Sequence, residues 1–393
     1  MPVTRWVEGP ISIVASDEPD PEALTAWERL VTGTPGSDVA QLPAWARVRA
    51  QAGFTPLYVL AYHGSTLVGG AQILQRRLSV LGPVGYVPYG PVVASRPDRA
   101  EVCRALSVAL EELCRKRFRG LFVQPPEGGD DIGDHLRERG FRPSDAGIAP
   151  IGSIRLDLGL SETQLRHMLS SKLRRWTRNG KWASQGVQVR LGGEQDIPLL
   201  ARLLAHTAAY QGFEPLPEDY LRTLYQELSS AGLAVLFVGE LDGEPLATQL
   251  FTFCSDTFKM RIMGFERTER AARLHFPSAV VWEALRWAKS RGFRWFDFGG
   301  LSPAALSVLL DGEGERKDLP GPDEFKVRWG GTPFRYPAPV ELLPSLVVRA
   351  GYDLARRGLG GHRVLHAMRG RLRHGAGRTT PEHASVGAAG AAE

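Results

Sequence analysis

The sequence predicts an α/β protein with mixed sheets, built as two tandem domains. The chain has 393 residues, and at about 100–200 residues per domain this length predicts about two domains. Strand-like and helix-like hydrophobic periods alternate along the chain. The second half repeats the order of the first, with a hairpin, then a helix, then a short strand. We expect an internal duplication, with two unrelated α/β halves as the alternative.

In the first half, apolar segments meet at clear turn signals. Two apolar runs flank His63-Gly64-Ser65, which is typical of a tight hairpin turn. Apolar residues then recur at helical spacing up to Arg117, and Pro125-Pro126 ends the apolar run after it. The elements expected here are strands at 57–62 and 66–74, a helix at 98–117, a strand at 120–124, a loop at 128–131 and a short helix at 134–139.

The second half repeats this order of elements. The apolar runs around Asp242-Gly243-Glu244 predict a second hairpin, and Pro277 opens a helical period. The elements expected here are helices at 196–210, 218–229 and 277–290, and strands at 234–241, 246–254, 258–264 and 295–298.

Charge, hydropathy and motif content exclude several classes of protein. The net charge is +5, and no apolar run approaches the roughly 18–20 residues of a membrane-spanning helix. The N-terminal residues up to Asp20 include acids and no apolar segment, and three cysteines cannot form a disulfide framework. We therefore expect a cytoplasmic protein without a signal peptide. The sequence lacks a Walker A loop, a GxSxG elbow, an HExxH motif and paired CxxC motifs, so we expect no metal and no hydrolase chemistry.

Two stretches are rich in basic residues. Residues 166–190 contain Lys and Arg but no acid, and Trp176 and Trp182 lie among them. Positive charges bind phosphates and flat rings stack on bases, so this pattern favours a nucleic-acid contact. An exposed helix whose Trp rings pack inward is the alternative. The arginines at 349–373, with leucines and a valine beside them, favour an RNA or membrane-surface contact.

The repeated α/β unit suggests a GNAT-like acyltransferase fold. Such folds commonly hold the pyrophosphate of acyl-CoA on backbone amides of a Gly-rich loop at a helix N-terminus. The corresponding segment here, between Gly264 and Pro277, reads FERTERAARLHF and contains no glycine. We therefore expect no CoA cradle and no cofactor, and an acyl donor that is held by other means.

A series of loose motifs in a fixed order resembles a known family. The motifs are Gln41-x-x-x-Trp45-x-x-Val48-Arg49, Tyr86-x-Pro88-Tyr89-Gly90-Pro91, SSKLRRWTRNGKWASQGV, HTAAYQGFEPLPEDYLRTL, Pro277-Ser278, FDFGG at Phe296–Gly300, and Asp323-Glu324-Phe325-Lys326 before Trp329-Gly330-Gly331. From about Gln41 to about Leu354, the chain resembles the Fem-type peptidyltransferases. That family transfers an amino acid from aminoacyl-tRNA to a peptidoglycan-precursor peptide.

The resemblance implies two tandem GNAT-like domains with a C-terminal segment that returns to the first. On this basis, domain 1 spans residues 1–152 and domain 2 spans residues 153–337. A basic helical segment at 338–374 is expected to pack on domain 1, and residues 375–393 are expected to form a disordered tail.

The resemblance also implies a reaction, in which an acceptor amine attacks the aminoacyl ester and the 3′-hydroxyl departs. Because the ester is already activated, the protein mainly aligns the reactants and stabilises an oxyanion. In the family, the Phe-Lys pair is associated with the tRNA end, so Lys326 is assigned as a catalytic phosphate contact or oxyanion stabiliser. A surface lysine at a loop-to-strand join is the alternative. Asp297, at a strand end, is the second catalytic candidate because it could orient an amine, and a capping carboxylate is the alternative.

Further residues are assigned to substrate and tRNA binding. The substrate-binding residues are Arg49, Trp45, Tyr89, Tyr210, Phe325 and Arg328. The tRNA-binding residues are Lys172, Arg174, Arg175, Arg178 and Lys181.

Departures from the family pattern bear on the acceptor. Arg49 stands where members that bind a nucleotide-linked muropeptide carry Lys, and Tyr210 and Tyr89 stand where the family carries Arg. Losing two anion ligands leaves two acceptors open, a muropeptide precursor or a small-molecule or peptide amine. The expected partners are this acceptor, aminoacyl-tRNA and, peripherally, the inner membrane surface. The alternatives are a GNAT-like N-acyltransferase with another acyl donor, and a non-catalytic RNA- or membrane-surface-binding protein.

Overall fold

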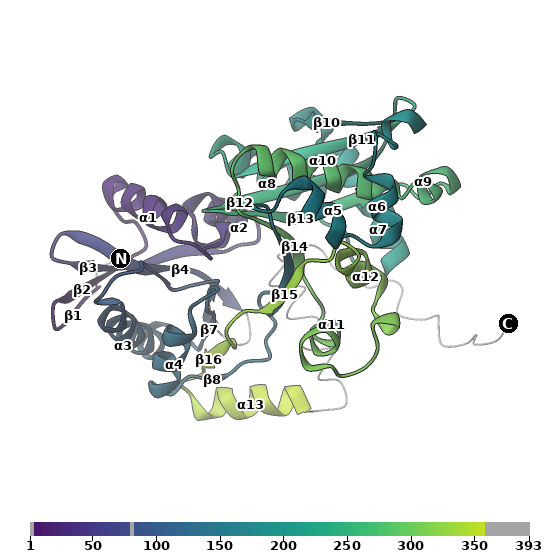
Figure 1. Cartoon of the computed structure of the whole chain (residues 1–393). Helices are drawn as coiled ribbons and strands as arrows, with labels where there is room; N and C mark the ends of the chain where they lie inside the picture. The colour runs from purple at the N-terminus through teal and green to yellow at the C-terminus, as the bar shows by residue number, and fades with distance from the viewer. Residues whose placement is uncertain (1–3, 79–81, 358–393) are drawn as a thin grey trace.

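The computed structural model describes residues 4–78 and 82–357, which fold around two sheets (Figure 1). The first sheet consists of β1 (Thr4–Glu8), β2 (Ile11–Ser16), β3 (Thr55–His63), β4 (Thr66–Leu78), β5 (Gly82–Pro88), β6 (Val92–Val93), β7 (Gly120–Gln124), β8 (Arg142–Pro143) and β16 (Val340–Leu342). Its order is β1-β2-β3-β4-β5-β7-β16-β8, with β6 paired to β4.

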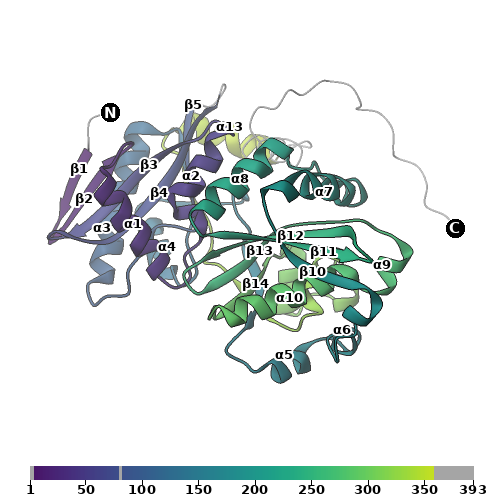
Figure 2. The same cartoon turned by 90° about the horizontal axis from the view of Figure 1, so that it is seen from above.

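The second sheet lies beside the first and belongs to the second half of the chain (Figure 2). It consists of β9 (Gly152–Asp157), β10 (Val187–Gly192), β11 (Ala234–Leu241), β12 (Glu244–Cys254), β13 (Thr257–Phe265), β14 (Trp295–Gly300) and β15 (Thr332–Arg335). Its order is β10-β11-β12-β13-β14-β9-β15.

Helices cover both faces of each sheet. They are α1 (Pro21–Gly33), α2 (Pro43–Ala50), α3 (Arg99–Arg117), α4 (Asp130–Glu138), α5 (Glu162–Met168), α6 (Ser171–Trp176), α7 (Ile197–Gln211), α8 (Glu218–Ser230), α9 (Glu269–Arg273), α10 (Phe276–Ser290), α11 (Pro303–Leu306), α12 (Gly321–Val327) and α13 (Leu346–Arg357). In Figure 1, α3 and α4 lie below the first sheet and α1 and α2 above it.

Both sheets contain the same unit, which confirms the predicted tandem α/β architecture. In the first sheet, the antiparallel strands β3, β4 and β5 are followed by α3, and β7 then pairs parallel to β5. In the second sheet, β11, β12 and β13 are followed by α10, and β14 pairs parallel to β13. Each hairpin also carries a bulge just before its turn, after Ala61 in one and after Gly239 in the other.

Each unit buries its own core, and one helix joins the two. Leu106 of α3 packs with strand residues such as Val59 in the first half, and Val280 of α10 packs with Phe258 in the second. Helix α2, although it belongs to the first half, contributes the fully buried Val48 to the core between α7, α8 and the second sheet. The two halves are therefore packed together through apolar contacts.

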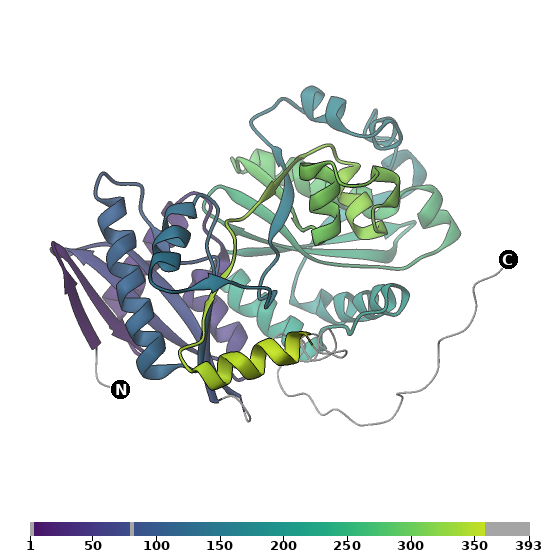
Figure 3. The same cartoon turned by 90° about the horizontal axis from the view of Figure 1, so that it is seen from below.

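The C-terminal part of the described chain returns to the first sheet. After β15 pairs with β9 in the second sheet, β16 inserts between β7 and β8 in the first. Buried Glu341 of β16 accepts hydrogen bonds from Arg142, Ser144 and Tyr352. Asp353 of α13 pairs with Arg142 at 2.6 Å, so this helix is held against the first half, on the outside of the molecule (Figure 3).

Helix α13 also carries large apolar side chains that are exposed to solvent. Leu346, Val347 and Leu354 are 79%, 82% and 74% exposed. The rest of the basic stretch 349–373, the end of the predicted segment 338–374 and the tail predicted at 375–393 lie outside the described residues.

Most expected elements are present, and the differences have local causes. Helix α4 begins at Asp130, whereas a loop was expected at 128–131. Asp130 and Asp131 lie in its first turn, where a negative charge is favoured by the helix dipole, and Asp131 also pairs with Arg99 at 2.6 Å. The strands that the sequence analysis did not predict are β1, β2, β5, β6, β8, β9, β10, β15 and β16.

Candidate active site

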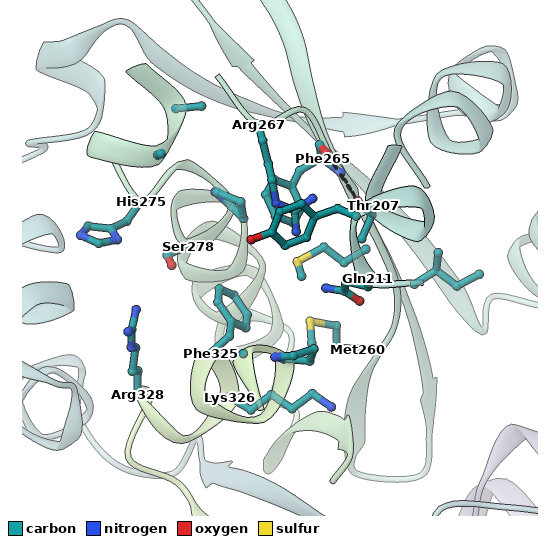
Figure 4. Close-up of a pocket in the computed structure, with 18 of the residues that line it drawn as sticks. Thr207, Gln211, Met260, Phe265, Arg267, His275, Ser278, Phe325, Lys326 and Arg328 are labelled. Atoms are coloured by element: carbon teal, nitrogen blue, oxygen red, sulfur yellow. Dashed lines mark hydrogen bonds between the residues drawn. The ribbon is translucent and has the colours of Figure 1, made fainter. Parts of the chain in front are cut away.

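A cavity of about 1030 Å³ opens in the second half of the molecule (Figure 4). It exists because β13 and β14 diverge. The parallel pairing with β14 covers only Thr257–Lys259 of β13. From Met260 on, β13 stays paired with β12 on one edge, while residues of this part of the strand line the cavity. Further walls come from α6, the end of α7, the start of α10 and α12.

Members of all three sets of predicted site residues line this cavity. They are Lys326, Phe325, Arg328, Tyr210 and Lys172. Residues more than a hundred positions apart in the chain are thus brought to one place, and α12 alone supplies the adjacent Phe325 and Lys326.

Lys326 is a half-buried cation of this wall. Its ammonium donates a hydrogen bond to the Gly300 carbonyl at the end of β14. Burial lowers the pKa of Lys326, while the carboxylates of Asp323 and Asp297 act in the opposite direction. An ammonium with one carbonyl partner retains two further N–H donors that it can direct at a ligand.

Asp297, the second predicted catalytic residue, lies on β14 behind the cavity wall and does not line the large cavity. It is 2% exposed and accepts hydrogen bonds from Ser153 and, at 2.7 Å, from the Gly299 amide. It borders a separate void of about 20 Å³, which is too small for an acceptor amine. Its contacts are those of a carboxylate that holds the Gly299 turn, the alternative that the sequence left open.

Three predicted substrate-binding residues are instead at the contact between the halves. Tyr89 is buried and its ring lies 4.6 Å from the Lys259 ammonium. Arg49 is 5% exposed and donates to the Tyr220 hydroxyl of α8 at 3.1 Å. Trp45 lies under the guanidinium of Arg261, 5.1 Å from its ring centroid. None of these three lines the large cavity, although Arg261, which contacts Trp45, does.

A buried ionic cluster accompanies them. Asp38, which precedes α2, pairs with Lys259 at 3.0 Å and with Arg261 at 3.3 Å, both on β13. Although burial opposes ionisation, these two cations hold the pKa of Asp38 well below its ordinary value. Burial raises the pKa of Tyr89 to about 12, so this ring stays neutral beside the cluster.

The predicted tRNA-binding residues lie on and after α6. Lys172, Arg175 and Arg178 are exposed, and Arg174 donates to the Leu169 carbonyl at 3.1 Å. Lys181 lies 4.5 Å from the ring centroid of Trp176.

Trp176 and Trp182 are not available to stack on bases. The two rings stack on each other with centroids 6.1 Å apart, and each residue is 7% exposed. The indole N–H of Trp182 also donates to the Leu274 carbonyl at 2.7 Å. Of the two interpretations of this stretch, inward packing of the Trp rings is confirmed, while the basic groups remain at the surface.

The sequence analysis missed His275, which lines the cavity beside Ser278. His275 has a positive φ of 50° immediately before α10, a strained conformation for a residue other than glycine. Burial lowers its pKa, and the nearby cations Lys172, Arg328 and Arg175 add to this effect. The imidazole is therefore neutral at pH 7. A single histidine in an apolar context gave no pattern by which to find it.

The described residues offer no site for a resident metal ion and no membrane-spanning helix. No group of three or more His, Cys, Asp or Glu side chains in 4–78 and 82–357 could hold a metal. No helix in the same part of the chain is long and apolar enough to cross a membrane.

Comparison with known proteins identifies the fold. Residues 164–327 match the family described as an acetyltransferase (GNAT) domain. A search of curated protein sequences finds no match. Among solved structures, FemX superposes with a TM-score of 0.72 at 16% identity, covering 85% of this chain and 98% of FemX.

A second solved structure is similar at a lower level. The C-terminal domain of a proposed lysylphosphatidylglycerol synthetase from Agrobacterium fabrum superposes with a TM-score of 0.50 at 14% identity, covering 86% of this chain and 98% of that domain. At identities this low, the superpositions establish the fold alone. The chain has a Fem-type architecture of two tandem GNAT-like units, as its sequence motifs predicted.

Proposed function

We propose that this protein is an aminoacyl-tRNA-dependent aminoacyltransferase that forms an amide bond on an acceptor amine. The observation that carries the proposal is the convergence of Lys326 with members of the predicted substrate and tRNA sets on one large cavity. The proposal is further supported by the match of residues 164–327 to an acetyltransferase (GNAT) domain and by the fold shared with FemX.

In the proposed reaction, one C–N bond forms and one C–O bond breaks. The acceptor nitrogen attacks the ester carbonyl carbon, and the carbonyl oxygen becomes an oxyanion. The tetrahedral intermediate then collapses, the C–O bond to the ribose breaks, and the amide forms. The proton lost by the amine goes to the departing 3′-oxygen, directly or through a base.

Lys326 suits the role of oxyanion ligand. Its ammonium is fixed by Gly300 and partly desolvated, and a preoriented cation in a poorly hydrated site stabilises developing negative charge strongly. His275 lines the same cavity as Lys326, and its lowered pKa keeps the imidazole able to accept a proton, so we propose it as the proton acceptor.

Charge at the cavity favours a phosphate-bearing donor. Exposed Lys172, Arg175 and Arg178 lie on or just after α6, and Lys172 itself lines the cavity. Such a surface supports binding of a tRNA acceptor end through its phosphates, with an affinity that falls as salt rises.

Features of α10 argue against acyl-CoA as the donor. The segment before this helix contains α9 in place of a Gly-rich loop. Pro277 has no N–H, and the Ser278 amide already donates to the His275 carbonyl at 2.9 Å. A pyrophosphate would therefore find few free backbone donors. We propose that the protein uses no cofactor and takes its acyl group from tRNA.

The test offers the purified protein a tRNA pool charged with labelled amino acids. The acceptors are a muropeptide nucleotide, a lipid-linked precursor and a panel of small amines, so that both acceptor classes are sampled. We expect RNase-sensitive transfer of label into one of these acceptors. Transfer from acyl-CoA but from no charged tRNA would contradict the proposed donor.

Two lysine variants make the test specific to the site. Lys326→Ala should lower transfer about 10²- to 10³-fold, the usual cost of losing one oxyanion donor, while tRNA binding is retained. Lys317→Ala, which removes an exposed lysine paired with Glu315, is the matched control and should leave transfer unchanged. Equal rates in the two variants would exclude Lys326 from the reaction.

A further inference from the structure

Three side chains at the cavity wall form a stack to which the reaction described above assigns no role. The guanidinium of Arg267 lies 3.8 Å from the ring centroid of Tyr210 and 4.1 Å from that of Phe265. All three residues line the cavity of about 1030 Å³, and Figure 4 shows Arg267 and Phe265 together at its upper wall. The cation is thus in contact with two aromatic rings.

Arg267 has no anionic partner among the residues that the structure describes. The adjacent Glu266 is already engaged, with Arg202 at 3.3 Å and His206 at 2.7 Å. Contact with aromatic rings uses none of the N–H donors of the guanidinium. A guanidinium positioned in this way can direct its donors at the oxygens of a phosphate or carboxylate.

Tyr210 supplies an open aromatic face next to that cation. Although its ring contacts Arg267, the residue is 73% exposed. Its position is fixed because α7 ends at Gln211, where Gly212 takes a φ of 73° and donates its amide to the Ala208 carbonyl at 2.8 Å. A planar ligand ring can stack on an exposed tyrosine without displacing protein atoms.

We propose that the Phe265-Arg267-Tyr210 stack is a nucleotide-binding site, with the base on Tyr210 and a phosphate on Arg267. This inference rests on the proposed function and names the ligand chemistry at one wall of the same cavity. Position 210 is a tyrosine, so it carries no positive charge of its own. Arg267, from the loop between β13 and α9, brings a positive charge into contact with the ring of this tyrosine.

Nucleotide chemistry has two sources in the proposed reaction, the 3′ end of tRNA and a nucleotide-linked acceptor. Binding of four probes to the full chain separates them. The probes are an acceptor-stem RNA ending in CCA, the same RNA without its terminal adenosine, uridine diphosphate, and coenzyme A. Fluorescence anisotropy measures the RNA affinities and calorimetry measures those of the small ligands.

Paired substitutions isolate each half of the site. Tyr210→Leu removes the ring and should weaken binding roughly 5- to 150-fold, whereas Tyr210→Phe keeps the ring and should bind like the wild type. Arg267→Gln removes the charge and should weaken binding about tenfold or more, and Arg267→Lys should recover part of that loss. Arg104→Gln, at an exposed position on α3, is the charge-matched control.

The pattern of losses assigns the source. Weaker binding of the CCA-ending RNA, with no effect on the shortened RNA, places the terminal tRNA nucleotide on the stack. Weaker binding of uridine diphosphate places the acceptor there. If uridine diphosphate or coenzyme A binds through the stack while no RNA binds the wild type, the nucleotide site stands and the tRNA donor of the proposed function falls. Wild-type affinity of Tyr210→Leu and Arg267→Gln for every probe, or failure of all probes to bind, overturns the inference.

Discussion

Replacing Asp38 with Asn tests how the two halves are held together. Asp38 accepts contacts from Lys259 at 3.0 Å and Arg261 at 3.3 Å, and it also caps the backbone amide of Ala40 at 3.0 Å. The amide of Asn preserves the shape but leaves two buried cations without their counter-charge. Removing one partner of a buried ion pair costs about 3–5 kcal/mol, so we expect a loss of that size in the free energy of unfolding.

The assay is urea unfolding at pH 7, followed by tryptophan fluorescence. Glu227→Gln is the matched control, because Glu227 pairs with Arg47 at 2.5 Å at the surface, where such a pair contributes about 0.2–1 kcal/mol. A double variant with Lys259→Met should recover part of the loss, since it removes one unpaired cation. A cost for Asp38→Asn no larger than that of the control would refute the reasoning.

The same substitution has a pH signature with a defined sign. The two cations hold the pKa of Asp38 below its ordinary value of 3.8 in the folded protein. A carboxylate with a depressed folded-state pKa contributes stability that is present above its unfolded-state pKa and is lost as pH falls toward the folded-state value. Below about pH 4, the wild type should therefore lose more stability than Asp38→Asn. Parallel curves for the two proteins between pH 7 and pH 3 would contradict this assignment.

Three further perturbations follow from the structure. Burial and nearby cations lower the pKa of His275, so transfer by the wild type should fall on the acid side of neutrality and His275→Gln should abolish that limb of the pH–rate profile; an unchanged profile would remove His275 as the proton acceptor. A Cβ at Gly330, where φ is 75°, would lie 2.0 Å from the Met168 carbonyl oxygen, so Gly330→Ala should lower the free energy of unfolding by about 2 kcal/mol or more in the same urea assay, and a wild-type midpoint would show that the loop relaxes. Exposed apolar side chains beside arginines favour binding to an anionic membrane surface. The protein should therefore sediment with phosphatidylglycerol vesicles, and replacing Leu346, Val347 and Leu354 of α13 with Ser should abolish this binding. Equal sedimentation of the variant and the wild type would exclude α13 as the membrane contact.

The arrangement of local elements could be predicted from the sequence. Helices such as α3 and α10 and the hairpins around Gly64 and Gly243 lie where hydrophobic period and turn residues indicated them. Period and turn chemistry are properties of neighbouring residues, so they can be read without knowledge of the fold. The repeat and the ordered motifs also predicted the tandem architecture.

Two of the strands that escaped prediction, β9 and β16, have partners far away in the chain. Strand β16 is three residues long, and it is a strand because residues 340–342 pair with β7 and β8. β9 pairs with β14 and β15, one on either side of it. No periodic pattern develops in the three residues of β16, so the tertiary structure alone decides that strand.

The sequence by itself named candidate residues for the site, and the tertiary structure decided which of them line one cavity and added His275 to them. The motifs named Lys326, Tyr210 and Asp297 alike, but the divergence of β13 from β14 opens a cavity at the first two and leaves Asp297 behind its wall. The type and order of the residues can be read directly from the sequence. The distance between two side chains depends on every element packed between them, which is why the contact between Arg267 and Tyr210 could not be predicted from the sequence.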